Sequence, residues 1–346
     1  MVVFQCAHLC AQEGRGDLRF VWYNVENLFD PFDDSLILDE EFLPGGLRQW
    51  NWVRFERKIE MICKVIAGTG GWAPSEIVAL AEVENDFVLH WLCRETPLLK
   101  YGYRWIHEDS PDPRGIDIAL LYLPDAFKPL QYTFYGVDIS PYTGKRTRDI
   151  LHVKGIVYEK DTLHLILNHW PSRWEGKLET ENRRRLAALR CRRLFDSITV
   201  AENSPAIIVS GDFNDEASDP SIRLTLGVQA CETRIGNIND TLLYSLSSNT
   251  DKHVRGSLKY RGRWYLFDQV FTSGSLLCNG RGECSGLYVL CDGMKVYRPD
   301  FLLERDIQWA GLKPFRTWNG YHYAGGFSDH LPVYVDLWSI QVPYPF

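Results

Sequence analysis

The sequence lacks the features of a membrane protein, a nucleic-acid-coating protein or a chain of several domains. No stretch of its 346 residues approaches the roughly 20 consecutive apolar residues of a membrane-spanning helix. Lys and Arg total 38 against 45 Asp and Glu, a net charge of -7, so no overall positive field attracts nucleic acid. A nucleic-acid substrate would therefore need a local basic cleft. No repeat or Pro/Ser-rich linker divides the chain, whose 45% hydrophobic content suffices for a substantial core.

The nine cysteines do not have the spacing of a zinc site. A disulfide within the one sequence cluster, Cys278, Cys284 and Cys291, is one interpretation. Scattered buried thiols are the other, and this second reading is favoured for the cysteines in helix-like segments, Cys63, Cys93 and Cys191.

The first residues form an apolar run that ends in small residues and turns polar at Glu13. Segment 1–17 therefore resembles the end of a secretory signal, although it has no basic region before the apolar part. We predict a periplasmic or secreted protein on this ground. A disordered N-terminus on a cytoplasmic protein is the alternative.

Short apolar runs rich in β-branched and aromatic residues alternate with fewer helical patterns. They predict strands at 19–24, 77–83, 101–107, 116–123, 150–158, 163–169, 206–210, 265–272 and 333–337, and helices at 52–67, 87–95 and 179–197. The intervals 30–50 and 224–262 lack periodicity and predict surface loops beside a site. We predict an N-terminal segment at 1–17 and one α/β (α+β) domain at 18–346.

The helix predicted at 179–197 carries a dense run of arginines between residues 183 and 193. Leu186, Leu189 and Leu194 give it the apolar spacing of an amphipathic helix, so its charges are interpreted as a solvated face. A nucleic-acid-binding patch is the alternative.

Polar side chains stand where several predicted strands end, which is where open sheets tend to present chemistry. Asn24 ends one apolar run, Glu82 ends a second, and Gly211-Asp212-Phe213-Asn214 follows a third. Each alone is more often a turn or an exposed strand end. A carboxylate after an apolar run is nonetheless costly to desolvate unless it is paired or bound to metal, and Mg²⁺ prefers carboxylate and amide oxygens.

Histidines and further acids follow other strands. His169 comes directly after an apolar run and four residues before Arg173, whose planar guanidinium can pair with phosphate. Asp268 lies inside a predicted strand and needs a partner, for which an imidazolium such as that of His330 is the best candidate. A lone histidine at a strand end is more often structural. The prediction of an active site therefore depends on all of these polar residues together.

The order of these motifs resembles the endonuclease/exonuclease/phosphatase superfamily over about residues 18–338. This group includes pancreatic deoxyribonuclease, exonuclease III-type repair enzymes, inositol polyphosphate 5-phosphatases and neutral sphingomyelinases. The landmarks are the segments 23–29, 81–85, 114–119, 168–173, 211–214, 268–269 and 328–330. The resemblance implies a deoxyribonuclease I-like, four-layer α/β/β/α sandwich with the active site where the strand ends of two packed sheets meet.

The resemblance also implies roles for individual residues. Glu82 would be the principal Mg²⁺ ligand, with Asn24 and Asp329 nearby, and Mn²⁺ or Ca²⁺ could substitute. Asp212 would activate the attacking water, while Asn214 would hold the water or the phosphate. His330, oriented by Asp268, would stabilise the transition state. The remaining catalytic role, that of a general acid, falls to His169. Contacts to the substrate or its phosphate fall to Arg114, Arg173 and Asn24.

The sequence departs from the family pattern in one place near the metal ligand, where Ala81 stands instead of the usual Gln. Glu84 also remains open as a competing ligand. We predict a Mg²⁺-dependent, nuclease-like phosphodiesterase that attacks a phosphoester with activated water, acting as a monomer without a protein partner. A phosphatase or phospholipase C-type enzyme on inositol phosphates, sugar phosphates or lipid headgroups is the first alternative. A non-catalytic binding member of the fold is the second.

Overall fold

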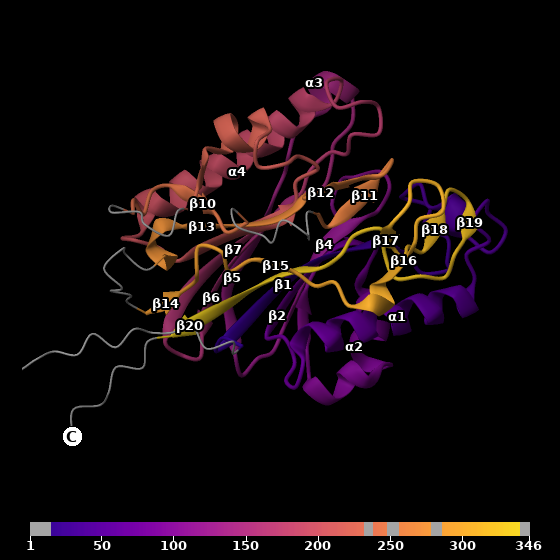
Figure 1. Cartoon of the computed structure of the whole chain (residues 1–346), viewed down its shortest axis with the longest axis horizontal. Coiled ribbons are helices and arrows are strands. Elements are labelled where there is room, and N and C mark those ends of the chain that lie inside the picture. The colour runs from indigo at the N-terminus through magenta and orange to yellow at the C-terminus, as the bar shows by residue number, and fades with distance from the viewer. Residues whose placement is uncertain (1–14, 232–237, 248–255, 278–285, 340–346) are drawn as a thin grey trace, which may run out of the picture.

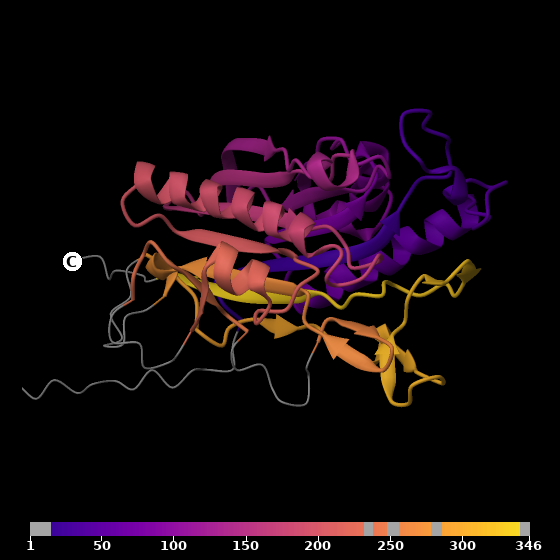
Figure 2. The same cartoon turned by 90° about the horizontal axis from the view of Figure 1, so that it is seen from above.

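The computed structural model describes residues 15–231, 238–247, 256–277 and 286–339. Two large sheets pack face to face, and helices cover their outer faces (Figures 1 and 2). None of the helices in the described ranges is long and apolar enough to cross a membrane. Most of the predicted N-terminal segment, together with Cys278 and Cys284, lies outside the described residues.

The first sheet contains seven strands and holds both ends of the described chain. Its central pairs are β1 with β2, which are parallel, and β1 with β20, which are antiparallel. In spatial order the strands are β14 (Leu287–Tyr288), β20 (Val333–Ser339), β1 (Leu18–Leu28), β2 (Ile77–Val83), β4 (Asp117–Tyr122) and β3 (Arg104–Ile106), with β15 (Lys295–Val296) also paired to β20.

The second sheet also contains seven strands, and its central pair, β7 with β8, is parallel. In spatial order they are β5 (Phe127–Tyr135), β6 (Ile150–Val157), β7 (Asp161–His169), β8 (Ile207–Asp212), β13 (Asp268–Ser273), β10 (Leu243–Ser245) and β9 (Val228–Ala230). Three two-stranded ribbons gather at one end of the sandwich (Figure 1): β11 (Leu258–Tyr260) with β12 (Arg263–Tyr265), β16 (Leu303–Arg305) with β17 (Leu312–Pro314), and β18 (Trp318–Asn319) with β19 (His322–Tyr323).

Strand β1 shows why the sequence builds four layers. Its alternate side chains point to opposite faces. Phe20 and Trp22 enter the core between the two sheets, whereas Val21 and Tyr23 enter a second core under the helices α1 (Trp52–Gly70) and α2 (Asp86–Arg94). Because both faces are buried, the strand reads as one continuous apolar run.

The helix α4 (Glu181–Ala201) covers the outer face of the second sheet with Ala188, Phe195 and other apolar residues. The predicted four-layer α/β/β/α fold is therefore confirmed. Short elements complete it: the α-helix α3 (Ser140–Thr143), the π-helix η3 (Ser221–Leu226) and the 3₁₀ turns η1 (Glu40–Phe42), η2 (Pro97–Tyr101), η4 (Gly274–Leu276) and η5 (Asp300–Leu302).

Three sequence expectations about elements are wrong. The strand predicted at 101–107 begins as the turn η2, which ends at left-handed Gly102, so only β3 is extended. The strand β5 was missed because it is an edge strand with mostly half-exposed or exposed side chains and an internal Pro129. The interval 224–262 contains β9 and the buried strand β10, which are too short to show a period.

The arginines of α4 do not form a uniformly solvated face. Arg184 is fully buried and its Nε lies 2.8 Å from an Asp215 carboxylate oxygen. Arg183 and Arg192 do lie at the surface edge and pair with Glu175 and Asp196.

The cysteines differ from the expected cluster. Cys291 forms a disulfide with Cys231, at a Cα to Cα distance of 5.3 Å, rather than within its own sequence cluster. Cys63, Cys93 and Cys191 are buried free thiols, as predicted. The bond joins the residue after β9 in the second sheet to the segment after β14 in the first.

Candidate active site

The candidate residues meet because the strands that carry them end at the same edge of the sandwich. In the parallel pair β1 and β2, Asn24 lies opposite Ala81, the residue before Glu82. In the parallel pair β7 and β8, His169 lies opposite Asp212. The antiparallel strand β13 begins there, with Asp268 opposite Asp212. Sequence positions almost 250 residues apart thus converge at one edge, as the hydrogen bond between Trp22 and Asp268 also shows.

The backbone at this edge adopts the left-handed conformation at four residues that are not glycine. Glu26, Asn27, Glu82 and Asn214 have φ values of 53°, 55°, 65° and 50°. The β1 and β2 register slips in the same place, between Asn24 and Leu28. Such conformations persist only where surrounding contacts enforce them, and they cluster at functional sites.

Asp212 lies at the centre of the group and is buried. Its Oδ2 accepts a hydrogen bond from Asn24 Nδ2 at 3.1 Å and lies 3.6 Å from His330 Nε2 and 3.8 Å from His169 Nε2. Its Oδ1 accepts from the backbone N–H of Asn214 at 3.0 Å. Burial raises the pKa of Asp212 to about 7, against the opposing effect of His330. The carboxyl group can therefore take up a proton near neutral pH.

His330 is bound to Asp268. The two side chains lie 2.6 Å apart, from Nδ1 to Oδ2, and Asp268 is fixed in turn by Trp22 Nε1 and the hydroxyl of Ser257. Burial alone would lower the pKa of His330, but Asp268 and Asp212 raise it well above its ordinary value. The ring is therefore an imidazolium whose Nε2–H faces Asp212.

His169 is electrostatically the opposite of His330. Its Nε2 lies 3.8 Å from both Glu82 and Asp212, and its Nδ1 is buried without a hydrogen-bond partner. Burial and then the nearby Arg148 lower the pKa of His169 well below its ordinary value. A neutral imidazole can donate one hydrogen bond to a substrate oxygen, but it is a poor source of a proton. This finding argues against the general-acid role that the family resemblance implies.

The surroundings of Glu82 fit a divalent cation. Its Oε2 accepts from the backbone N–H of Asn27 at 2.9 Å, and its Oε1 contacts the Asn24 amide at 3.3 Å. No Lys or Arg among the described residues pairs with it at salt-bridge distance. Burial raises the pKa values of the Asp212 carboxyl group and of the nearby Glu26 carboxyl group to about 7, with a further contribution from the neighbouring carboxylates Asp268 and Asp329. A bound cation would balance the negative charge of these carboxylates with ligands of the hard, oxygen type.

The ligand atoms of Asp212, Asp268 and His330 also lie within 4.8 Å of one another. This group is less suited to a metal ion than Glu82, because the imidazolium repels a cation and its Nδ1 is already bonded to Asp268. Glu84, the competing candidate, points elsewhere: it accepts from the backbone N–H of Asp30 at 2.6 Å.

Four predicted contact residues have other partners. Arg173 forms ion pairs with Asp215 and Asp219. These two carboxylates already neutralise its charge, so it is not free to pair with a phosphate. Asp329 pairs with Arg316 at 2.9 Å rather than with Glu82. The Asn214 side-chain amide donates a hydrogen bond to the Trp170 carbonyl at 3.1 Å. The Arg114 side chain is 48% exposed, and its Nε lies 3.5 Å from Asp112 Oδ1.

Sequence reasoning missed a buried charged network under the site. Glu26 contacts Arg316 at 3.3 Å and accepts from the backbone N–H of Thr317 at 2.6 Å. Lys58 of α1 donates to Thr317 and to the Phe327 carbonyl. The one available signal was Lys58 itself, a charged residue on the otherwise apolar face of an amphipathic helix.

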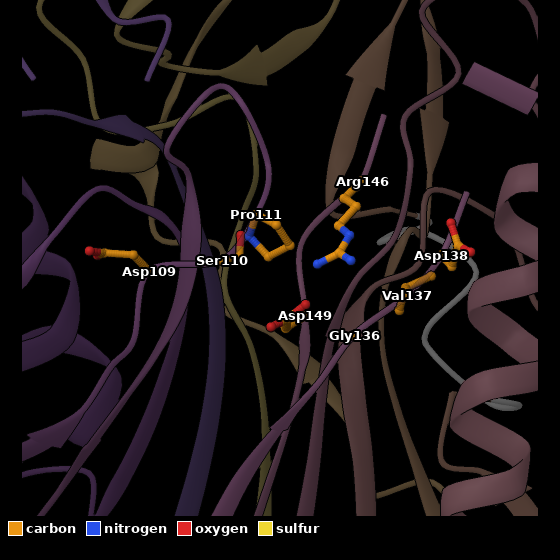
Figure 3. Close-up of a pocket in the computed structure, with 8 residues that line it drawn as sticks. All are labelled: Asp109, Ser110, Pro111, Gly136, Val137, Asp138, Arg146 and Asp149. Atoms are coloured by element: carbon orange, nitrogen blue, oxygen red, sulfur yellow. The ribbon is translucent and has the colours of Figure 1, made fainter. Parts of the chain in front are cut away.

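An open cavity of about 590 Å³ is lined by none of these candidate residues (Figure 3). Its walls carry three carboxylates, Asp109, Asp138 and Asp149, and one arginine, Arg146. Arg148, next to Asp149, donates to the Trp170 carbonyl, one residue after His169. Arg148 thus links the segment that carries Asp149 to the strand end that carries His169, while the converging polar groups, not the cavity, mark the chemistry.

Solved structures of low sequence identity share this fold. The catalytic domain of human Nocturnin with bound sulfate is 16% identical, with a TM-score of 0.53, and the match covers 93% of this chain and 94% of that chain. A humanised D. rerio TDP2 is 15% identical with a TM-score of 0.55 and coverages of 92% and 98%. A mannosyl-6-phosphatase of Bacteroides thetaiotaomicron is 15% identical with a TM-score of 0.54 and coverages of 92% and 99%.

Sequence comparison is more specific than these structural matches. No curated protein matches the chain. The profile described as "Endonuclease/Exonuclease/phosphatase family", however, matches residues 19–339, nearly the whole chain. The protein therefore belongs to the endonuclease/exonuclease/phosphatase family, whose members are phosphoester hydrolases.

Proposed function

We propose that the protein is a Mg²⁺-dependent phosphoester hydrolase in which Asp212 removes a proton from the attacking water. The observation that carries the proposal is the environment of Asp212, a buried carboxyl group with a pKa of about 7 between the Asn24 amide and the His330 imidazolium. A general base is most effective when its pKa lies near the working pH. The backbone N–H of Asn214 holds the other carboxylate oxygen, so the base is fixed in orientation.

The two histidines would then serve the phosphoryl group in different ways. The His330 imidazolium, held by Asp268, offers a charged Nε2–H to the negative charge that develops on the phosphoryl oxygens. Neutral His169 offers an uncharged hydrogen-bond donor beside it. Asp268 fixes the His330 donor before substrate binds, which reduces the reorganisation needed in the transition state.

Glu82 and Asn24 would hold the Mg²⁺, for which Mn²⁺ or Ca²⁺ could substitute. The ion when bound supplies positive charge to the phosphoryl and leaving oxygens. The Asn27 N–H orients the Glu82 carboxylate. Asp329 acts on the network through its ion pair with Arg316 and is proposed as a positioning residue rather than a ligand.

The lining of the cavity of about 590 Å³, in which Asp149 is the sequence neighbour of Arg148, favours a small substrate that carries hydroxyl groups. The three carboxylates, which outnumber the one arginine, would repel a polyanion, and they can accept hydrogen bonds from sugar or inositol hydroxyls. The structurally similar mannosyl-6-phosphatase is consistent with a sugar phosphate. We therefore favour a phosphatase or phosphodiesterase for small phosphoesters.

Nuclease activity is the second candidate. It is supported by the half-exposed guanidinium of Arg114 near the site and by the likeness to D. rerio TDP2, which was solved with a single-stranded DNA product. The net charge of -7 weighs against it.

We further propose that residues 18–346 act as one domain and that the protein is exported as a monomer. The disulfide between Cys231 and Cys291 supports export, since disulfides persist mainly in oxidising compartments.

The test is Mg²⁺-dependent hydrolysis of a panel of sugar phosphates, inositol phosphates, lipid headgroup diesters and plasmid DNA. Asp212→Asn should lower kcat by about 10³-fold or more, because the water loses its base. The matched control is Asp125→Asn, an exposed aspartate after β4. Turnover by the folded Asp212→Asn protein equal to that of Asp125→Asn would refute the mechanism. Hydrolysis of plasmid DNA alone would select the nuclease.

A further inference from the structure

A second group of candidate ligands lies outside the proposed catalytic residues, at the hairpin between β3 and β4. His107 follows β3, Asp117 begins β4, and Asp109 lies in the connecting loop. The two strands are antiparallel, with Ile106 opposite Leu120, so the chain folds back and brings the three side chains together. One ligand atom from each lies within 4.8 Å of the others.

Two of these side chains are buried with unpartnered polar atoms. The side chains of His107 and Asp117 are only 3% and 2% exposed. His107 Nε2 and Asp117 Oδ1 nevertheless have no hydrogen-bond partner. Buried polar atoms are nearly always paired, because each unpaired one loses its interaction with water without compensation. Something that binds both an imidazole nitrogen and a carboxylate oxygen would remove this cost.

The geometry suits a metal ion. His107 Nε2 lies 4.0 Å from Asp117 Oδ2, the second oxygen of the carboxylate whose Oδ1 is unpartnered. Two atoms that each lie about 2.1 Å from one tetrahedral ion are about 3.4 Å apart, so a single ion can bind both once the side chains close by about 0.6 Å. Asp109 is exposed and can supply a third ligand from the solvent side. On the other side of the ring, Nδ1 lies 3.7 Å from Asp86 Oδ1, the type of carboxylate that often orients a ligand histidine.

The donor set selects the kind of ion. An imidazole with two carboxylates suits Zn²⁺ or Mn²⁺ better than Mg²⁺ or Ca²⁺, which prefer oxygen ligands throughout. We propose that His107, Asp109 and Asp117 form a second metal site for a transition-metal dication of the Zn²⁺ type, separate from the site at Glu82.

The proposed second metal site connects a residue that pairs with the strand β2 to a residue in the wall of the cavity. Asp117 pairs with Val83, the residue after Glu82, in the β2 and β4 ladder. Asp109 also belongs to the wall of the cavity of about 590 Å³, and its carboxylate is turned away from Arg146 across the cavity (Figure 3). A bound ion would therefore fix one wall of the cavity relative to β2, the strand that carries Glu82.

The test is Zn²⁺ binding by the full chain, measured with a competing chromophoric chelator in excess Mg²⁺. The proposal expects His107→Ala to bind one Zn²⁺ fewer per chain than the wild type. It expects Asp109→Asn, a change at an exposed residue, to weaken that ion at least about 10-fold. The Asp212→Asn protein should retain the His107-dependent ion, which separates this site from the catalytic one and from failure of the proposed function.

The matched control is His90→Ala. His90 also faces a carboxylate, at 3.7 Å from Glu95, but its side chain is 56% exposed. It should bind as much Zn²⁺ as the wild type. Co²⁺ as a probe should give a weak visible spectrum that is lost in His107→Ala. If folded His107→Ala and Asp109→Asn proteins both bind Zn²⁺ as tightly and in the same number as the wild type, the proposal is overturned.

Discussion

Asp212 sits in an environment that predicts a specific pH dependence. Because burial raises its pKa to about 7, the carboxyl group is protonated and unable to accept a proton from water below that pH. We expect kcat/KM to rise about tenfold per pH unit below neutrality and to level off above about pH 7. Initial rates at a constant concentration of free Mg²⁺ would measure this. A profile that is flat from pH 5 to 7 would show that another group is the base.

Glu84 offers a test of stability rather than catalysis. Burial, with Asp30 next in effect, raises its pKa from 4.5 to about 9. The folded protein holds this proton while the unfolded chain releases it, so the contribution of Glu84 is fully present below pH 4.5 and is lost as pH rises to about 9. Glu84→Gln should therefore increase the free energy of unfolding at pH 8.5 by at least about 1 kcal/mol, and by less at pH 5.

Urea unfolding at the two pH values would measure the Glu84 effect. The control is Glu60→Gln, whose side chain is 69% exposed on α1 and should change stability little at either pH. Equal effects of Glu84→Gln at pH 5 and 8.5 would mean that this carboxyl group is not held protonated.

At the scale of elements, α1 contacts the segment that leads to the site through the side chain of Lys58. Its buried ammonium bonds Thr317 and the Phe327 carbonyl, and so ties the helix to the segment that precedes Ser328 and His330. Lys58→Met keeps the apolar stem but leaves buried Glu26 with less positive charge nearby. We expect it to lower the free energy of unfolding by about 2–4 kcal/mol and to reduce kcat.

The control for Lys58 lies on the same helix. Lys64 is exposed and contacts only the Phe301 and Phe327 rings, at 4.3 Å and 5.8 Å from the ring centres, among the interactions described. Lys64→Met should cost less than about 1 kcal/mol. Chemical denaturation and steady-state kinetics of both variants would check the expectation, and equal stabilities would contradict it.

The elements also show what the sequence could predict. Strands such as β2 and β8, buried on both faces, carry unbroken apolar runs, so their positions and the polar residues at their ends were readable. The sequence did not show which side chains these polar residues would contact in the folded protein. Arg173 is neutralised by Asp215 and Asp219, and His169 is neutral while His330 is charged. These differences arise from burial and from long-range neighbours, which have no signature in local sequence.

At the scale of the whole molecule, the disulfide between Cys231 and Cys291 is a covalent link between the two sheets. One end follows β9 at the edge of the second sheet, and the other follows β14 at the edge of the first. The bond spans 60 residues of sequence, so breaking it frees a large loop in the unfolded chain. It should therefore contribute to the stability of the sandwich as a unit.

We expect the Cys231→Ser/Cys291→Ser protein to lose about 2–4 kcal/mol of unfolding free energy relative to the oxidised wild type. The loss should appear in one cooperative transition, because the bond joins both halves of the core between the sheets. Reductant should destabilise the wild type by a similar amount and leave the double variant unchanged, since its remaining described cysteines, Cys63, Cys93 and Cys191, are free thiols. A wild type equally stable with and without reductant would show that the bond does not form in solution, and it would remove the structural support for export.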